Sequence, residues 1–189
     1  MYNTTAVTIG NYEPGQDRNV AALSNLSMCD GFLIAMNKDK TYFMKEALKE
    51  AKKALKIDEV PIGCVIVKDG EIIARGYNHR ENKNLVESHA EMEAIRKANK
   101  KLNSWRLPDC DIYITLEPCM MCMGAIIQSR ISHIYYGASD FKGGALGSSI
   151  NALEAKNINH YPEVEGGILL DECSSLLSEY FKTKRQKNK

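Results

Sequence analysis

A strand-like segment runs straight into an apolar segment that carries two cysteines, and this junction constrains the fold more than any other feature. In DIYITL, residues 111–116, Ile112, Ile114 and Leu116 alternate along one side, as in a β-strand. The PCMMCMGAII that follows Glu117 is apolar all round, which predicts a buried helix. A strand joined directly to a buried helix is typical of α/β proteins, in which helices cover a sheet.

The rest of the chain alternates helix and strand patterns in the same way. Apolar residues at helical spacing predict further helices over 41–55, 88–102 and 173–180. The expected strands are the two arms of a hairpin around Asp69-Gly70, ISHIYYG at 131–137, and the short EVE at 163–165. This order of elements predicts an α/β layered fold with a mixed sheet.

Length and composition indicate one domain behind a different N-terminal segment. Residues 1–38 are rich in Asn, Thr, Ser and Gly and have no sustained period, so we expect a weakly ordered leader or a segment foreign to the native protein. Residues 39–189 form the expected domain. The net charge of +1 provides no general attraction to nucleic acid or membrane. The basic tail FKTKRQKNK is typical both of a local phosphate-binding patch and of a solvated end.

Six cysteines without a secretory leader predict a reducing, cytoplasmic setting, in which clustered cysteines are commonly metal ligands or catalytic groups. Cys119 and Cys122 share one face at the start of a helix, where the helix dipole favours thiolates. The pair is also compatible with a redox motif or with two core cysteines.

A second group of candidate ligands lies upstream in ESHAEMEAI. His89 supplies an imidazole and Glu91 a carboxylate at the start of a helix. Taken alone, Ser88 and Glu91 match a capping box, and His89 matches a core histidine. Together with the two cysteines, they fit a single metal site better.

The number of ligands favours a catalytic zinc site. His89, Cys119 and Cys122 leave the fourth position of zinc open for water, whose pKa the metal lowers. Glu91 would then carry protons as a general base and acid close to the metal. The alternative is a structural zinc closed by a fourth cysteine, for which the candidates are Cys64, Cys110 and Cys173.

These motifs resemble a known superfamily. HAE and PCMMC match the H-x-E and P-C-x-x-C pattern of the cytidine deaminase-like zinc deaminases. EVPIGCVIV, GYNHR, SWRL, YITLEPCMMCMGAI and SRISHIYYGASDFKGGALGS resemble the bacterial tRNA-specific adenosine deaminases. The likeness extends from about Tyr42 to Arg185.

The resemblance implies a three-layer α/β/α sandwich around a five-stranded mixed sheet, in a homodimer with one Zn²⁺ per subunit. It also implies hydrolytic deamination of adenosine to inosine at the wobble position of tRNA, with no membrane association. Asn78 would hydrogen-bond the flipped nucleotide, and Ala90, Asp140 and Lys142 would line the substrate site. The residues expected against the anticodon loop all lie on the last helix: Phe181, Lys182, Lys184 and Arg185.

Two other functions share the same sequence features. A deaminase of free guanine, cytosine or dCMP would use the same zinc chemistry, and a non-catalytic zinc-stabilised binding module would use only the metal. Cys64 and Met123 depart from the family pattern, which puts the shape of the pocket in question more than its chemistry.

Overall fold

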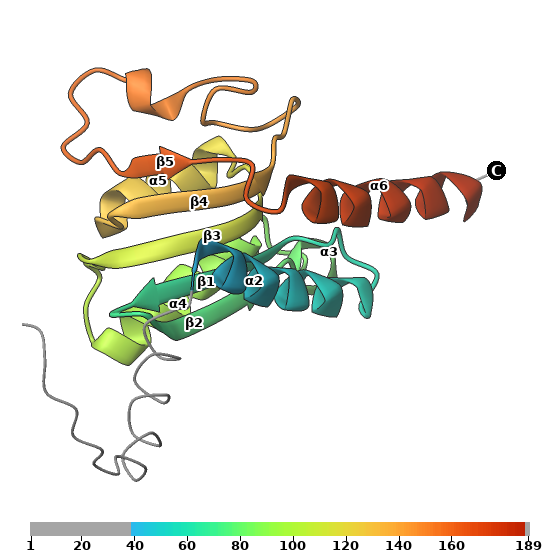
Figure 1. Cartoon of the computed structure of the whole chain (residues 1–189), viewed down its shortest axis with the longest axis horizontal. Coiled ribbons are helices and arrows are strands. Elements are labelled where there is room, and N and C mark those ends of the chain that lie inside the picture. Colours follow the sequence, from blue (N-terminus) through green and yellow to red (C-terminus); the bar gives the residue numbers. More distant parts are fainter. Residues whose placement is uncertain (1–38, 188–189) are drawn as a thin grey trace, which may run out of the picture.

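The computed structural model describes residues 39–187, so the expected leader at 1–38 lies outside the described residues. Five strands form one mixed sheet in the order β2-β1-β3-β4-β5 (Figure 1). The central strand β3 is antiparallel to β1 and parallel to β4. The strands are β1 (Gly63–Lys68), β2 (Glu71–Tyr77), β3 (Cys110–Leu116), β4 (His133–Ala138) and β5 (Glu163–Glu165).

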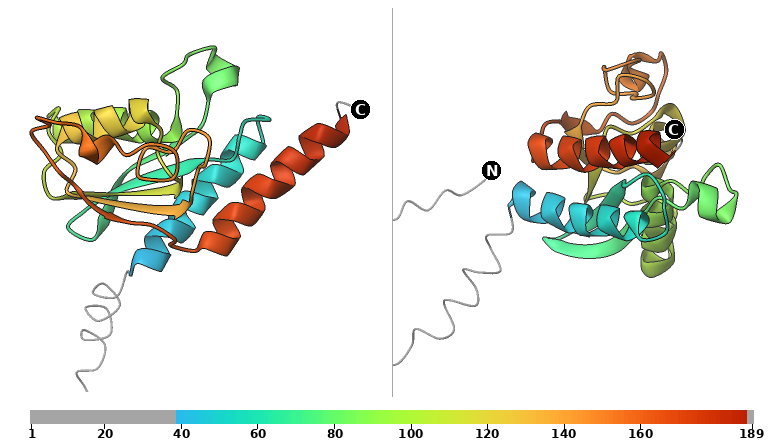
Figure 2. Two further views of the ribbon diagram at one scale, coloured as in Figure 1. Left: turned by 90° about the horizontal axis from the view of Figure 1, so that it is seen from above. Right: turned by 90° about the vertical axis from the view of Figure 1, so that its right-hand side faces the viewer.

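Helices cover both faces of this sheet, which confirms the predicted three-layer α/β/α architecture (Figures 1 and 2). α2 and α6 pack on one face, where Phe43 and Cys173 join a core cluster with Val65. α4 and α5 pack on the other face. The helices are α2 (Lys40–Leu55), α3 (Arg80–Lys83), α4 (Ala90–Leu102), α5 (Met120–Ser129) and α6 (Leu170–Lys187), with a 3₁₀ turn, η1, at Ala152–Glu154.

Three local expectations were wrong. Leu116 packs with the α2–α6 cluster and not beside Ile112 and Ile114, because it ends β3 where the chain turns toward α5. The α5 helix is not buried all round, since Met120 is 52% exposed. α4 begins at Ala90 and not at Ser88, because the preceding residue has an extended backbone.

Two glycines set how closely the helices approach the sheet. A Cβ on Gly63 would lie 2.0 Å from the Ala47 carbonyl oxygen of α2. A Cβ on Gly76 would lie 2.1 Å from the Ala90 carbonyl oxygen of α4. Because only glycine fits at these contacts, the first residue of α4 lies directly against β2.

The last helix, α6, runs beside α2 and projects beyond the sheet (Figure 2). Asp58, just after α2, holds it at two points. The Tyr180 hydroxyl donates to the Asp58 carbonyl oxygen at 3.1 Å, and the Lys184 ammonium pairs with the Asp58 carboxylate at 2.6 Å. Among the described residues, no helix combines the length and the apolar character that crossing a bilayer requires.

Candidate active site

The starts of two helices bring the three expected metal ligands together. His89 is the N-cap of α4 and Cys119 is the N-cap of α5, and both have extended backbones. Neither side chain makes a capping hydrogen bond. The His89 Nδ1 atom lies 3.7 Å from the Cys119 sulfur and 3.6 Å from the Cys122 sulfur.

This arrangement fits a tetrahedral metal ion. Zn–N and Zn–S bonds of ordinary length, at a tetrahedral angle, place the two ligand atoms about 3.5 Å apart. The ligand atoms of His89, Cys119 and Cys122 all lie within 4.8 Å of one another. Within residues 39–187, no fourth His, Cys, Asp or Glu joins this group, so it has the three-ligand composition of an open site.

Electrostatics at the cluster favour a thiolate. Hydrogen bonds with the Cys122 thiol and with His89 lower the pKa of Cys119 to about 3, against the opposing effect of its partial burial. The positive end of the α5 dipole acts in the same direction. The hydrogen bond with Cys119 and burial raise the pKa of the Cys122 thiol, so Cys119 is the sulfur that is held as the thiolate, the form that binds metal.

Glu91 lies beside this cluster and does not cap α4. It is 4% exposed, and burial raises the pKa of its carboxyl group. The N-cap is His89 and not Ser88, so the capping-box alternative is wrong.

Of the two residues that depart from the family pattern, Cys64 is fully buried and its pKa is raised by burial and then by the Glu91 charge. Met123 is a buried core residue of α5.

Asn78 follows β2 and is buried, and a carboxylate that we did not predict orients it. The Asn78 amide Nδ2 donates to a Glu59 oxygen at 2.9 Å, while the other Glu59 oxygen accepts from the backbone N–H of Asn82 at 2.7 Å. This leaves the Asn78 Oδ1 atom free of Glu59. Ala90, the first residue of α4, is fully buried.

A groove of about 710 Å³ collects several of the predicted substrate residues. Asp140 and Lys142 line it from the loop after β4, and Phe181 and Arg185 line it from α6. The remaining predicted cations of α6 do not line it, since Lys184 pairs with Asp58 and Lys182 is exposed elsewhere on the helix. The groove also contains Phe141, which the sequence reasoning missed.

A buried carboxylate, Glu117, fastens this loop to the cysteine motif. It accepts hydrogen bonds from the backbone N–H groups of Asp140 at 3.1 Å, Leu146 at 2.8 Å and Ser148 at 3.2 Å. Burial alone would raise its pKa, but the Ser148 hydroxyl and these N–H groups lower it. A Cβ on Gly144 would lie 2.5 Å from the Glu117 carboxyl carbon, so the loop can close on Glu117 only with glycine there.

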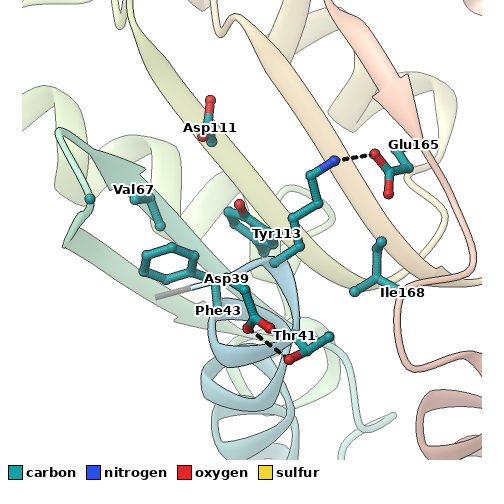
Figure 3. Close-up of a pocket in the computed structure, with 10 residues that line it drawn as sticks. Asp39, Thr41, Phe43, Val67, Asp111, Tyr113, Glu165 and Ile168 are labelled. Carbon is teal, nitrogen blue, oxygen red and sulfur yellow. Dashed lines mark hydrogen bonds and ion pairs between the residues drawn. The ribbon is translucent and has the colours of Figure 1, made fainter. Parts of the chain in front are cut away.

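Another hollow, of about 640 Å³, lies at the opposite end of β3 and holds none of the predicted site residues (Figure 3). Asp39, Asp111 and Glu165 line it together with the rings of Phe43 and Tyr113. An ion pair between Lys40 and Glu165 spans it and joins α2 to β5. The other two acids are also engaged within the fold, since Asp39 caps α2 and Asp111 pairs with His133 of β4.

Comparison with known proteins agrees with this geometry. The model of the MafB19-like deaminase family matches residues 36–185. Two tRNA-specific adenosine deaminases, from Streptococcus pyogenes serotype M1 and Bacillus subtilis strain 168, are each 49% identical to the chain, over 80% and 82% of its length. The matches span 88% and 95% of those relatives. The chain belongs to the tRNA-specific adenosine deaminase family.

Solved structures agree with this assignment. A structure from a study of A-to-I editing by tRNA deaminases at the wobble position has a TM-score of 0.71 and 46% identity to this deaminase, covering 73% of this chain and all of that one. A guanine deaminase from Bacillus subtilis has a TM-score of 0.51 and 42% identity, covering 53% of this chain and 65% of that one.

We predict that Cys119→Ala will lose the bound metal while the domain stays folded. Removing one of three ligands leaves a two-ligand group, too few for a stable protein site. Metal per chain is measured by elemental analysis after dialysis. Cys173→Ala, which removes a buried thiol on α6, is the matched control and should retain the metal. Stoichiometric metal in Cys119→Ala would contradict the ligand assignment.

Proposed function

We propose that this deaminase hydrolyses adenosine to inosine at the wobble position of tRNA, with one zinc ion held by His89, Cys119 and Cys122. The observation that carries the proposal is the three-ligand cluster with the buried Glu91 carboxyl group beside it. The groove lies close by in the chain, since Leu116, which lines it, is three residues before Cys119. The names of the relatives support adenosine in tRNA as the substrate.

The donor set supports zinc in particular. Two thiolates and an imidazole suit zinc, whereas magnesium and calcium prefer oxygen ligands. When bound with an open fourth position, zinc supplies a water molecule of lowered pKa near the substrate. The absence of a fourth ligand among residues 39–187 argues against a closed structural site.

Glu91 is the proposed proton carrier. Its buried carboxyl group, whose pKa is raised, lies beside the ligand cluster on α4 without belonging to it. It would accept one proton from the attacking water and deliver it to ring nitrogen N1. It would then carry the second proton, from the hydroxyl group formed on C6, to the amino group that departs as ammonia. The product of adenosine is inosine, with ammonia released.

Asn78 and Ala90 are the proposed contacts to the flipped nucleoside. Glu59 holds the Asn78 Nδ2 atom and so fixes which end of the amide faces away from it. The free Oδ1 atom is then an acceptor of defined position. Ala90 lies between His89 and Glu91, and its buried side chain packs in the core next to both.

Guanine deaminase is the second candidate, favoured by the Bacillus subtilis structure at 42% identity. A free base requires a closed pocket, whereas here α6 projects beyond the sheet and only one of its faces lines the groove (Figure 1). Exposed cations next to an aromatic side chain suit a single-stranded RNA loop better. A tRNA substrate implies action in the cytoplasm.

We predict that Glu91→Gln will lower turnover by about 10²–10⁴-fold and leave metal binding unchanged, because only the proton carrier is removed. Ammonia release is measured with an anticodon stem-loop carrying adenosine at the wobble position, and with free adenosine, cytidine and guanine. Glu87→Gln, an exposed neighbour, is the control. Substantial activity in Glu91→Gln would mean that another residue is the general base. Turnover of free guanine alone would mean that the protein is a guanine deaminase and that RNA is not its substrate.

We predict different salt dependences for two adjacent cations of α6. Arg185 lines the groove, whereas Lys184 is paired with Asp58 on another face of the helix. Arg185→Gln should weaken stem-loop binding and reduce the slope of log K against log salt by about one. Lys184→Gln should leave that slope nearly unchanged. Equal effects of the two variants would mean that the groove face has no special role.

We also propose a homodimer formed through the segment that leads into α4. Leu85 and Val86 are 45% and 72% exposed, only a few residues before His89. Adjacent exposed apolar side chains at a site of this kind are typical of an interface. Val86→Lys is predicted to shift the mass in solution from two chains to one, as measured by light scattering. A monomeric wild-type protein would refute the interface.

A further inference from the structure

The large apolar side chain most exposed to solvent in the described part of the chain is that of Phe141, which is 81% exposed. Single exposed apolar residues are ordinary on protein surfaces. Phe141 differs because it lies on the groove wall, between Asp140 and Lys142 in the loop after β4. Whether Phe141 can bind a ligand therefore depends on how firmly its loop is held and on which side chains lie next to it in the groove.

The backbone on both sides of Phe141 is held in place. The Asp140 N–H donates to the Glu117 carboxylate at 3.1 Å, and the Lys142 N–H donates to the Asp140 carboxylate at 3.0 Å. Further along the loop, the Ala145 N–H donates to the Pro118 carbonyl oxygen at 2.9 Å. A ring presented by a fixed loop loses less conformational entropy on binding than one on a mobile loop.

The neighbours of Phe141 indicate what it binds. Phe181 of α6, 46% exposed, lines the same groove, as do the cations Lys142 and Arg185. Aromatic rings that stack on bases, together with cations that contact phosphates, are the combination found in grooves for single-stranded nucleic acid. A purely apolar partner would leave the two cations desolvated and unpaired.

The groove is separate from the place of the reacting base. None of His89, Glu91, Cys119 and Cys122 lines it, although Leu116 at its edge is three residues before Cys119. A base at the metal cluster would thus have its neighbours in the strand close to the groove. We propose that Phe141 stacks on a base adjacent to the adenosine that is deaminated, a contact that rests on the proposed RNA substrate.

The test compares Phe141→Leu with Phe141→Trp in the full-length, metal-loaded protein. Leu keeps an apolar side chain of similar size but cannot stack, whereas Trp can. Base stacking on an aromatic side chain is worth about 5- to 140-fold in affinity. We expect Phe141→Leu to lower kcat/KM on the stem-loop by about that factor, mainly through KM, and Phe141→Trp to retain wild-type values.

A fluorescence measurement distinguishes stacking from a general effect on the loop. Stem-loops carry 2-aminopurine in place of the base on either side of the target adenosine. Stacking quenches this fluorophore, so we expect wild type and Phe141→Trp to quench one of the two positions, and Phe141→Leu to quench neither. Equal quenching in all three proteins, or equal kcat/KM, overturns the role of Phe141. Failure of the wild type to deaminate the stem-loop overturns the proposed substrate instead.

Discussion

The structure depends on the meeting of two helix N-termini beside the central strand. α4 and α5 both begin at a candidate ligand, and both direct the positive ends of their dipoles toward the same small volume. That field stabilises thiolate before any metal arrives. The close contact of Gly76 with the first residue of α4 keeps His89 within reach of the two cysteines. The loops that lead to and from the cluster are in turn held by hydrogen bonds to buried side chains.

Two buried carboxylates, Glu59 and Glu117, hold several of these loop segments in place. Burying a charge is costly unless hydrogen bonds replace the lost water. Glu59 and Glu117 each meet this requirement with backbone N–H groups, and Glu59 also binds the Asn78 amide. In doing so, they hold the segments that carry Asn78 and the groove loop. Glu117 is the single charged residue in an otherwise apolar stretch and precedes Pro118, a signal that would have revealed it, whereas Glu59 follows Asp58 and carries no comparable signal.

The sequence predicted the alternation of strands and helices and the cysteine pair because their determinants are local, whereas the three-layer arrangement was expected from the family resemblance. Strand alternation, helical spacing and the i, i+3 cysteine pair can all be read within one element, and the mixed three-layer sheet was confirmed. Partners distant in the chain could not be read in this way. Lys184 and Arg185 are equivalent in the sequence, yet their positions around α6 point one to Asp58 and the other to the groove. The sequence also matched a helix N-cap at Ser88, but the backbone is still extended at His89, which is the N-cap in the structure.

The turn after α2 has a consequence for how substrate binding is transmitted. Asp58 holds the last helix through Tyr180 and Lys184, and the next residue, Glu59, holds the amide of Asn78. The helix expected to contact the anticodon loop and the side chain expected to contact the nucleoside are therefore held by two consecutive residues, Asp58 and Glu59. A tilt of α6 away from α2 would break the contacts that Tyr180 and Lys184 make with Asp58. The position of α6 relative to the Asn78 side chain therefore depends on two residues that are neighbours in the chain.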